Sequence, residues 1–103
     1  MLSVIESPQL FLEKGLFAQG AIAGEFAFVA QDGRAADGTL SDLTPGGQAR
    51  RTLDNLSAGL KTAGLGLSNV VSLMVYLPRY EGAAEVSEVV SAAFAGDAKN
   101  LPA

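Results

Sequence analysis

The side chains of this sequence that could carry chemistry are carboxylates, hydroxyls, amides and amines, because the chain contains no histidine and no cysteine. It therefore has no disulfide, no thiolate nucleophile, no Ser–His triad and no zinc site of the usual nitrogen and sulfur ligands. Any reaction must use Asp, Glu, Ser, Thr, Tyr, Lys or Arg, the backbone, or water.

Four residues stand out by type and position. Asp32 follows an apolar run and, as a carboxylate at a strand end, could orient water or an amine. However, an Asp that precedes a glycine, as Asp32 precedes Gly33, more commonly forms a turn. Tyr76 and Tyr80 could donate hydrogen bonds into a cleft, or pack at the ends of their elements. Glu88 is expected on the solvated face of a helix.

Length and composition indicate one folded domain, residues 1–103. With 49% apolar and 17% charged residues, the chain is too hydrophobic for intrinsic disorder. The net charge of −4 and the scattered basic residues disfavour nucleic acid as a partner. There is no run of 18 apolar residues and no basic region before an apolar one at the N-terminus, so we expect a cytoplasmic protein without a membrane partner. We expect no metal and no other cofactor.

A β-hairpin is predicted near the N-terminus. Residues 21–23 and the aromatic, β-branched residues 26–29 are separated by Gly24-Glu25. Residues 32–47 are rich in Gly and Asp and predict a loop within the domain.

Two stretches have the apolar spacing of amphipathic helices. The first begins with Thr44 as N-cap and Pro45 as first helical residue, and we expect it to end at Gly64. The second covers residues 81–94 and is expected to end at Gly96. The apolar stripes comprise Ala49, Leu53, Leu56, Leu60 and Ala63 in the first helix, and Ala83, Val86, Val90 and Ala93 in the second.

Residues 70–77 read VVSLMVYL and predict a strand that is covered on both faces and ends at Pro78. Two amphipathic helices need a wider sheet than this strand, the hairpin and one N-terminal strand provide. Pro102 fixes an extended backbone shortly after the second helix, as where a chain enters another strand. We therefore expect the domain to be incomplete at its C-terminus.

Five stretches of the sequence carry a family resemblance through their residues and their order: residues 15–19 (GLFAQ), 24–29 (GEFAFV), 48–56 (QARRTLDNL), 70–77 (VVSLMVYL) and 85–89 (EVSEV). Together they resemble the RidA/YjgF family of small trimeric proteins, whose enzymatic members hydrolyse reactive enamines and imines to keto acids and ammonia. The third and fourth stretches are the most specific, because helix, turn and strand agree in order and spacing.

The resemblance covers residues 15–103 and implies an α+β fold, with a mixed sheet and two helices packed on one face. It also implies a homotrimer. The last two strands of the family would follow Ala103, so strands from a second chain or a missing segment would complete the sheet.

The family pocket lies between subunits and uses a Tyr, a Ser after Phe-Val, an Asn on the second helix and an Arg that clamps the substrate carboxylate. The resemblance places Phe17, Ala30 and Ser87 at the first three positions. The Arg would lie just beyond Ala103, where we also expect the catalytic residues. The candidate substrate-binding residues in this chain are Phe17, Ala30, Gln31, Asp32 and Ser87.

Three functions stay open. The first is a hydrolase acting on a C–N or related bond of a small metabolite, with this chain as the larger part of a precursor cleaved after Ala103. The companion chain would begin with Thr, Ser or Cys, whose free amine can serve as general base for its own side chain. The second is an imine deaminase whose Arg-bearing segment is missing. The third is a non-catalytic small-ligand binding module, since an apolar pocket can bind without reacting.

Overall fold

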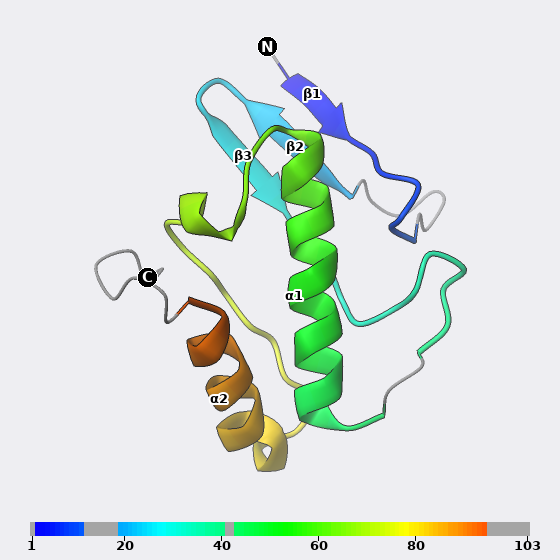
Figure 1. Ribbon diagram of the computed structural model, residues 1–103, viewed down its shortest axis with the longest axis vertical. Coiled ribbons are helices and arrows are strands. Elements are labelled where there is room, and N and C mark those ends of the chain that lie inside the picture. Colours follow the sequence, from blue (N-terminus) through cyan, green and yellow to red (C-terminus); the bar gives the residue numbers. More distant parts are fainter. Residues whose placement is uncertain (1, 12–18, 41–42, 95–103) are drawn as a thin grey trace.

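The computed structural model describes residues 2–11, 19–40 and 43–94 (Figure 1). Short strands come first, and helices make up the second half. In chain order the elements are β1 (Leu2–Ile5), β2 (Gly20–Ala23), β3 (Phe26–Val29), α1 (Pro45–Thr62), the 3-10 turns η1 (Leu67–Asn69) and η2 (Tyr80–Gly82), and α2 (Ala83–Phe94).

The three strands form an antiparallel sheet in the order β1-β2-β3. The predicted hairpin is confirmed: Ala23 pairs with Phe26 across a two-residue turn, Gly24-Glu25. Gly24 has φ +60°, and a glycine at the first central position with positive φ is the signature of a type II′ turn, whose twist matches that of the flanking strands.

The two faces of the sheet differ in what covers them. Ile5 is buried, and Val29 lies against α1, where a Cβ added at Gly59 would be 3.1 Å from Val29 Cγ1. Phe26 and Phe28 alternate with inward-facing neighbours and are exposed. One face therefore packs on α1, and the described residues leave the other face open.

Helix α1 begins and ends as predicted. The hydroxyl of Thr44 accepts a hydrogen bond from the Gly47 amide at 3.1 Å, and Pro45 is the first helical residue. Gly64, just after the helix, has φ +76°, a conformation that glycine adopts without steric cost. Leu53 and Leu60 are buried on the inner side of the helix.

Helix α2 packs beside α1 (Figure 1). The two helices lie close together near their N-termini, where a Cβ at Gly82 would be 2.8 Å from Pro45 Cβ. Val86 and Phe94 of α2 are buried. The predicted second helix is thus formed, beginning with the 3-10 turn η2, whereas its expected end at Gly96 lies outside the described residues.

The strand predicted over residues 70–77 is wrong for this structure. The segment runs between α1 and α2 without regular secondary structure (Figure 1). Val70 donates to the carbonyl of Leu67, and no other backbone hydrogen bond involves residues 70–77 within the described part of the chain. Sequence pattern can favour an extended conformation, but a strand exists only where a second backbone edge pairs with it.

The α+β fold class is confirmed, with one sheet and two helices. The described sheet is antiparallel throughout, and α1 is the helix that packs on it. Within the described ranges, no helix is long and apolar enough to cross a membrane.

Candidate functional site

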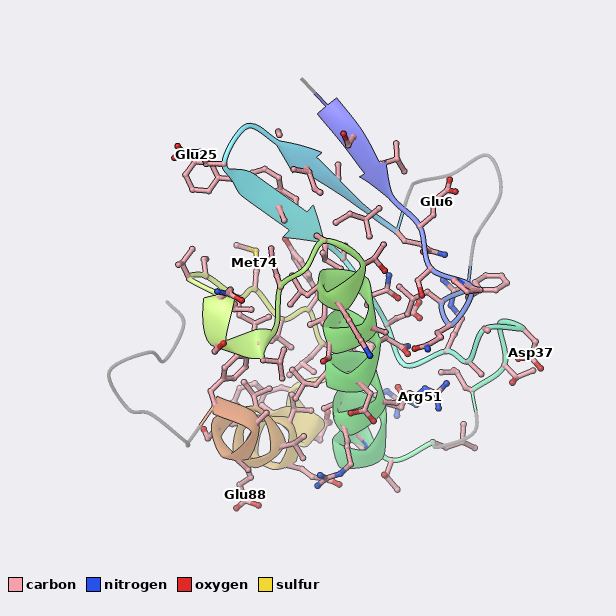
Figure 2. All side chains as sticks on the ribbon, turned by 45° about the horizontal axis from the view of Figure 1, so that its top comes forward. Glu6, Glu25, Asp37, Arg51, Met74 and Glu88 are labelled. Atoms are coloured by element: carbon pink, nitrogen blue, oxygen red, sulfur yellow. The ribbon has the colours of Figure 1, made fainter. Side chains whose placement is uncertain are left out.

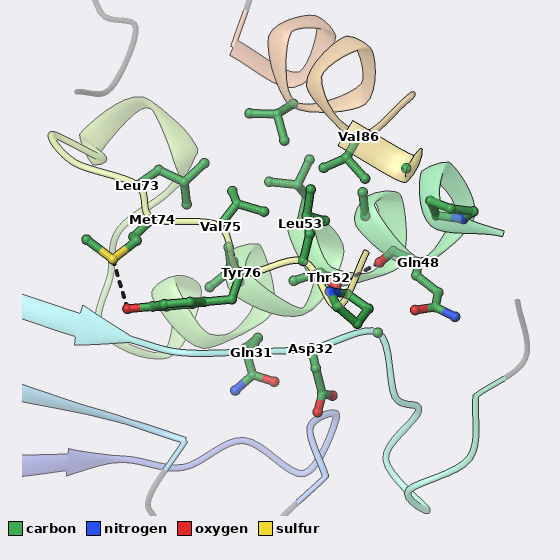
Figure 3. A pocket seen from close by; sticks show the side chains of 18 of the residues that line it. Gln31, Asp32, Gln48, Thr52, Leu53, Leu73, Met74, Val75, Tyr76 and Val86 are labelled. Atoms are coloured by element: carbon green, nitrogen blue, oxygen red, sulfur yellow. Dashed lines mark hydrogen bonds between the residues drawn. The ribbon is translucent and has the colours of Figure 1, made fainter. Parts of the chain in front are cut away.

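A cavity of about 950 Å³ lies between the end of β3, one side of α1, and the segment that leads to α2 (Figure 3). Its walls are mostly apolar, with Leu53 and Leu56 from α1 and Val86 and Val90 from α2. Residues 29–33 form one side and residues 72–79 the other. The polar or charged residues among those that line it are Gln31, Asp32, Gln48, Thr52, Ser72, Tyr76, Arg79 and Glu81.

Gln31 and Asp32 line this cavity, but their polar ends bond elsewhere. The Gln31 side-chain amide donates to the carbonyl of Gln19 at 3.4 Å. The Asp32 carboxylate accepts from the backbone amide and the Nε of Arg34, at 3.1 and 2.8 Å. In Figure 3 both side chains point away from Tyr76. The Asp32 carboxylate therefore organises a turn, the role that Asp most commonly has before a glycine.

Asn55 holds the loop after β3 on α1. Its Nδ2 donates to the carbonyls of Asp32 and Arg34, at 2.8 Å each, and the residue is only 4% exposed. A Cβ added at Gly33 would lie 3.2 Å from the Gln48 carbonyl oxygen, so the loop backbone passes close to the helix. Sequence reasoning missed Asn55, and no local pattern in the sequence indicates its role.

The Arg34 guanidinium also contacts this loop and the N-terminal segment. It pairs with Asp32, and its Cζ lies 4.5 Å from the centre of the Phe11 ring, the geometry of a cation–π contact. Further along the loop, the hydroxyl and the amide of Thr39 donate to Asp37, and these bonds lower the pKa of the Asp37 carboxyl. Asp37 does not line the cavity, and Figure 2 shows it on the other side of α1 from Met74, which does.

Two hydroxyls of the cavity are already used as donors. Thr52 Oγ1 donates to the Gln48 carbonyl at 2.7 Å, within α1. The Tyr76 hydroxyl donates to Sδ of Met74 at 2.9 Å, both from the segment before α2 (Figure 3). Their protons are therefore not directed at a ligand in this structure.

Arg79 and Glu81 are the charged cavity residues that sequence reasoning missed. They come from the short connection before α2, and the sequence analysis singled out neither of them. Both are exposed, and neither forms a salt bridge with the described part of the chain. Because Asp32 is bonded to Arg34, Glu81 supplies the unpaired carboxylate of the cavity.

The structure brings together three of the five predicted site residues. Ala30, Gln31 and Asp32 line the cavity side by side. Ser87 is exposed on α2 and is not among the lining residues. Phe17 lies outside the described residues. No group of three or more His, Cys, Asp or Glu within the described ranges could hold a metal ion.

Comparison with known proteins identifies the class to which this fold and cavity belong. The chain matches the family model described as Endoribonuclease L-PSP over residues 11–103. It is also 32% identical over 92 residues to a RutC family protein of Pyrococcus horikoshii, across 82% of this chain and 68% of the relative. The chain therefore belongs to this family, which is the RidA/YjgF family of the sequence resemblance.

Solved structures share the fold at low sequence identity. Yeast Mmf1 superposes with a TM-score of 0.90 at 19% identity, over 100% of this chain and 81% of its own. YyfA of Yersinia pestis, described as a Rid family protein, gives 0.90 at 22%, over 100% and 82%. Escherichia coli TdcF, solved with bound serine, gives 0.82 at 22%, over 98% and 78%.

Proposed function

We propose that the protein is a hydrolase that cleaves a C–N or related bond of a small metabolite. The observation that supports this most directly is the cavity beside β3, where apolar walls meet Gln48, Arg79 and Glu81. Such a cavity suits a small organic ligand that is oriented by a few polar groups. A relative of the same fold, E. coli TdcF, holds serine in its solved structure.

In this proposal Glu81 is the carboxylate that activates water or receives the substrate proton. A general base must be unprotonated and free to reach the reacting atom. Glu81 lines the cavity and has no hydrogen bond or salt bridge with the described residues, whereas Asp32 is bonded to Arg34. The guanidinium of Arg79, from the same connection, would bind an anionic group of the substrate.

The proposal includes a companion chain from the same precursor, which begins with the Thr, Ser or Cys nucleophile. Thr52 and Tyr76 use their hydroxyl protons within this chain, and the third cavity hydroxyl, that of Ser72, has no base bonded to it among the described residues, which supports a nucleophile supplied from elsewhere. An N-terminal residue carries its own general base in its free amine, so this nucleophile requires no histidine. In the precursor the same hydroxyl or thiol would attack the carbonyl of Ala103 and displace its own nitrogen as the free amine, and water would then hydrolyse the resulting ester or thioester, which makes the processing autocatalytic.

One alternative is a non-catalytic small-ligand binding module. It is favoured by the bonding of Gln31 and Asp32, whose polar ends are used away from the cavity. A second alternative is an imine deaminase whose Arg-bearing segment lies outside this chain. The family description names an endoribonuclease, but a net charge of −4 disfavours the binding of an RNA backbone.

Three measurements separate these functions. Ammonia release from a fresh 2-imino acid, in which water adds to the C=N carbon and nitrogen leaves as ammonia, identifies a deaminase. The proposed enzyme is identified if the purified protein hydrolyses amides and does not increase the rate at which the imine is lost. Ligand binding with no turnover of either substrate assigns the binding module. Intact-mass analysis and N-terminal sequencing show whether a companion chain exists and whether it begins with Thr, Ser or Cys.

The role of Glu81 has its own test. We expect Glu81→Gln to lower kcat/KM by at least about tenfold, because a general base typically contributes on the order of a hundredfold or more. Glu88→Gln is the matched control, since Glu88 is exposed on α2 and does not line the cavity. Equal kcat/KM for the two variants would remove Glu81 from the mechanism.

A further inference from the structure

The loop after β3 contains two Asp-Gly steps, Asp32-Gly33 and Asp37-Gly38, and the sequence has no others. Such a step is chemically reactive, because glycine has no side chain to obstruct the approach of its backbone nitrogen to the carboxyl carbon of the Asp. The first step borders the cavity, whereas Asp37 lies on the other side of α1 from Met74 (Figure 2). The proposed function makes no use of the second step.

Both Asp side chains are held in the same way by the residue two positions further along the chain. Asp32 accepts hydrogen bonds from the amide and the Nε of Arg34. Asp37 accepts from the hydroxyl of Thr39 at 2.7 Å and from its amide at 3.0 Å, and these bonds lower the pKa of the Asp37 carboxyl. An ionised carboxylate is a poor electrophile, so each pair of bonds slows attack on the carboxyl carbon.

The backbone at Asp32 is also held in place. Attack by the next nitrogen requires rotation about the bond between Cα and the carbonyl carbon of the Asp, which moves the carbonyl oxygen as well. The Asp32 carbonyl accepts from Nδ2 of Asn55, which is almost fully buried. Gly33 is buried, and a Cβ added to it would be 3.2 Å from the carbonyl oxygen of Gln48. Rotation at this step would therefore break the bond with Asn55 and disturb the contact with α1.

The backbone at Asp37 is held only by its own turn. The Asp37 carbonyl accepts no hydrogen bond from the described residues. Two backbone bonds close the turn, from Gly38 to the carbonyl of Ala35 at 2.9 Å and from Ala35 to the carbonyl of Thr39 at 2.8 Å. Asp37 and Thr39 are exposed, and exposed turns open locally far more often than packed backbone does. Once the turn opens, the bonds from Thr39 are the remaining restraint on the carboxylate.

We propose that Asp37-Gly38 is a site of covalent self-modification at which isoaspartate forms, and that the Thr39 hydroxyl limits its rate. In this reaction the Gly38 nitrogen attacks the carboxyl carbon of protonated Asp37. A C–N bond forms, the nitrogen loses its proton and the carboxyl group loses its hydroxyl, so that one water leaves and a succinimide ring remains. Water then adds to one of the two ring carbonyls. Cleavage of the bond between the nitrogen and the α-carbonyl carbon gives isoaspartate, and cleavage on the other side restores Asp.

Isoaspartate at this site would weaken the attachment of the loop to the N-terminal segment. A Cβ added at Gly38 would be 2.7 Å from Cε1 of Phe11, so the Gly38 backbone lies directly against this ring. Arg34 contacts the same ring through its guanidinium. Isoaspartate lengthens the main chain by one carbon atom and adds a free α-carboxylate next to Gly38. The loop must therefore shift at Gly38, and it loses its fit against Phe11.

Peptide mapping of aged protein tests the assignment. The full chain is kept at neutral pH and physiological temperature, and isoaspartate at each Asp-Gly step is measured by chromatographic separation of digest peptides of equal mass. Methyl transfer from labelled S-adenosylmethionine to the new α-carboxylate confirms the product. We expect isoaspartate to form at least about tenfold faster at residue 37 than at residue 32, because only the first of these lies in a turn that opens locally. In guanidinium chloride, which unfolds both steps, the two rates should agree within about threefold.

Thr39→Val tests the role of the hydroxyl, since it removes this donor and keeps the branched shape of the side chain. We expect isoaspartate at residue 37 to form about three- to tenfold faster, because one of the two bonds that hold the carboxylate is lost. Thr62→Val is the matched control: the Thr62 hydroxyl donates to the carbonyl of Ala58 within α1, far from the loop in sequence. This variant should leave the rate unchanged. Circular dichroism confirms that both variants are folded.

Four results would overturn the inference. The first is equal rates at residues 32 and 37 in the folded chain, and the second is no isoaspartate at residue 37 over a period in which the unfolded chain forms it. The third is an unchanged rate in Thr39→Val. The fourth is a Thr39→Val effect of the same size in guanidinium chloride, which would come from the neighbouring side chain and not from the hydrogen bond. All rates are measured without substrate, so the outcome does not depend on the proposed function.

Discussion

Asn55 is the residue that connects the loop after β3 to the rest of the fold. Its amide group donates to two carbonyl oxygens of that loop, those of Asp32 and Arg34, from a position that is almost fully buried. Both bonds are partly buried, so a carbonyl that loses this donor regains only part of its hydration. The position of the cavity edge therefore depends on this one side chain, although the side chain does not line the cavity.

We expect Asn55→Leu to lower the free energy of unfolding by about 2–4 kcal/mol, because two hydrogen bonds are lost and two carbonyls are left without donors. The measurement is urea unfolding followed by circular dichroism. Asn69→Ala is the control: Asn69 is exposed, its side chain accepts one bond from the Gly66 amide, and its loss should cost less than about 1 kcal/mol. A similar loss in both variants would show that the loop is held by other contacts.

At the level of elements, two glycines allow the N-terminal ends of α1 and α2 to lie close together. A Cβ at Gly82 would be 2.8 Å from Pro45 Cβ, and a Cβ at Gly46 would meet the side chain of Glu85. Both glycines are buried. The helix N-termini can approach this closely because neither glycine has a side chain. Arg79 and Glu81 lie in the chain segment that reaches this close contact at Gly82. The contact therefore fixes the position of both charged residues.

We expect Gly82→Val to destabilise the fold by about 1–3 kcal/mol, because the added side chain must displace Pro45 or shift the helices. Gly66→Ala is the control, since nothing lies within 4 Å of its added Cβ and its φ is −140°. That substitution should change the free energy of unfolding by no more than about 1 kcal/mol, and in the stabilising direction. Thermal unfolding of the two variants measures the difference, and equal midpoints would contradict the close approach.

The elements that were predictable from sequence are those with local causes. Helix α1 could be predicted from Thr44, Pro45 and Gly64 because each acts on backbone within one turn of itself. The hairpin could be predicted from Gly24 for the same reason. Residues 70–77 could not be assigned correctly, because a strand needs a partner that is distant in the sequence, and no described strand provides one.

The residues of the candidate site also differ in whether their roles depend on neighbours in the sequence or on distant residues. The turn at Asp32 was predictable because its bonding partner, Arg34, is only two residues further along the chain. The role of Asn55 depends on carbonyls 21 and 23 residues distant, so no local pattern indicates it. Arg79 and Glu81 belong to the cavity only because the connection crosses beside α1, which spacing along the chain does not reveal.

For the whole molecule, the open face of the sheet is the most informative surface. Val4 pairs with Ala21, which pairs with Phe28, so these three side chains form one row across the sheet. Ala23 and Phe26 belong to the next such row. Val4, Phe26 and Phe28 are each more than half exposed. We propose that this face packs against the corresponding faces of two further copies, which gives the homotrimer implied by the family resemblance. A closed symmetric assembly would cover these rows in every copy.

Phe28→Glu tests this assembly at the centre of the open face. Because the Phe28 ring has inter-strand neighbours on the same face, a charge there would have to be desolvated in each copy, so we expect the variant to sediment as a monomer while the unmodified chain sediments as a trimer. Leu40→Glu is the matched control, since Leu40 is also exposed but belongs to the loop after β3, and it should remain trimeric. Circular dichroism separates lost assembly from lost folding, because a dissociated subunit keeps the signal of α1 and α2.

If the unmodified chain is a monomer, or if Phe28→Glu stays trimeric, this face does not form the interface. Neither result would bear on the edge of β3 that no described strand pairs with, because edge pairing uses backbone groups in the plane of the sheet and trimer contacts use side chains that stand perpendicular to it.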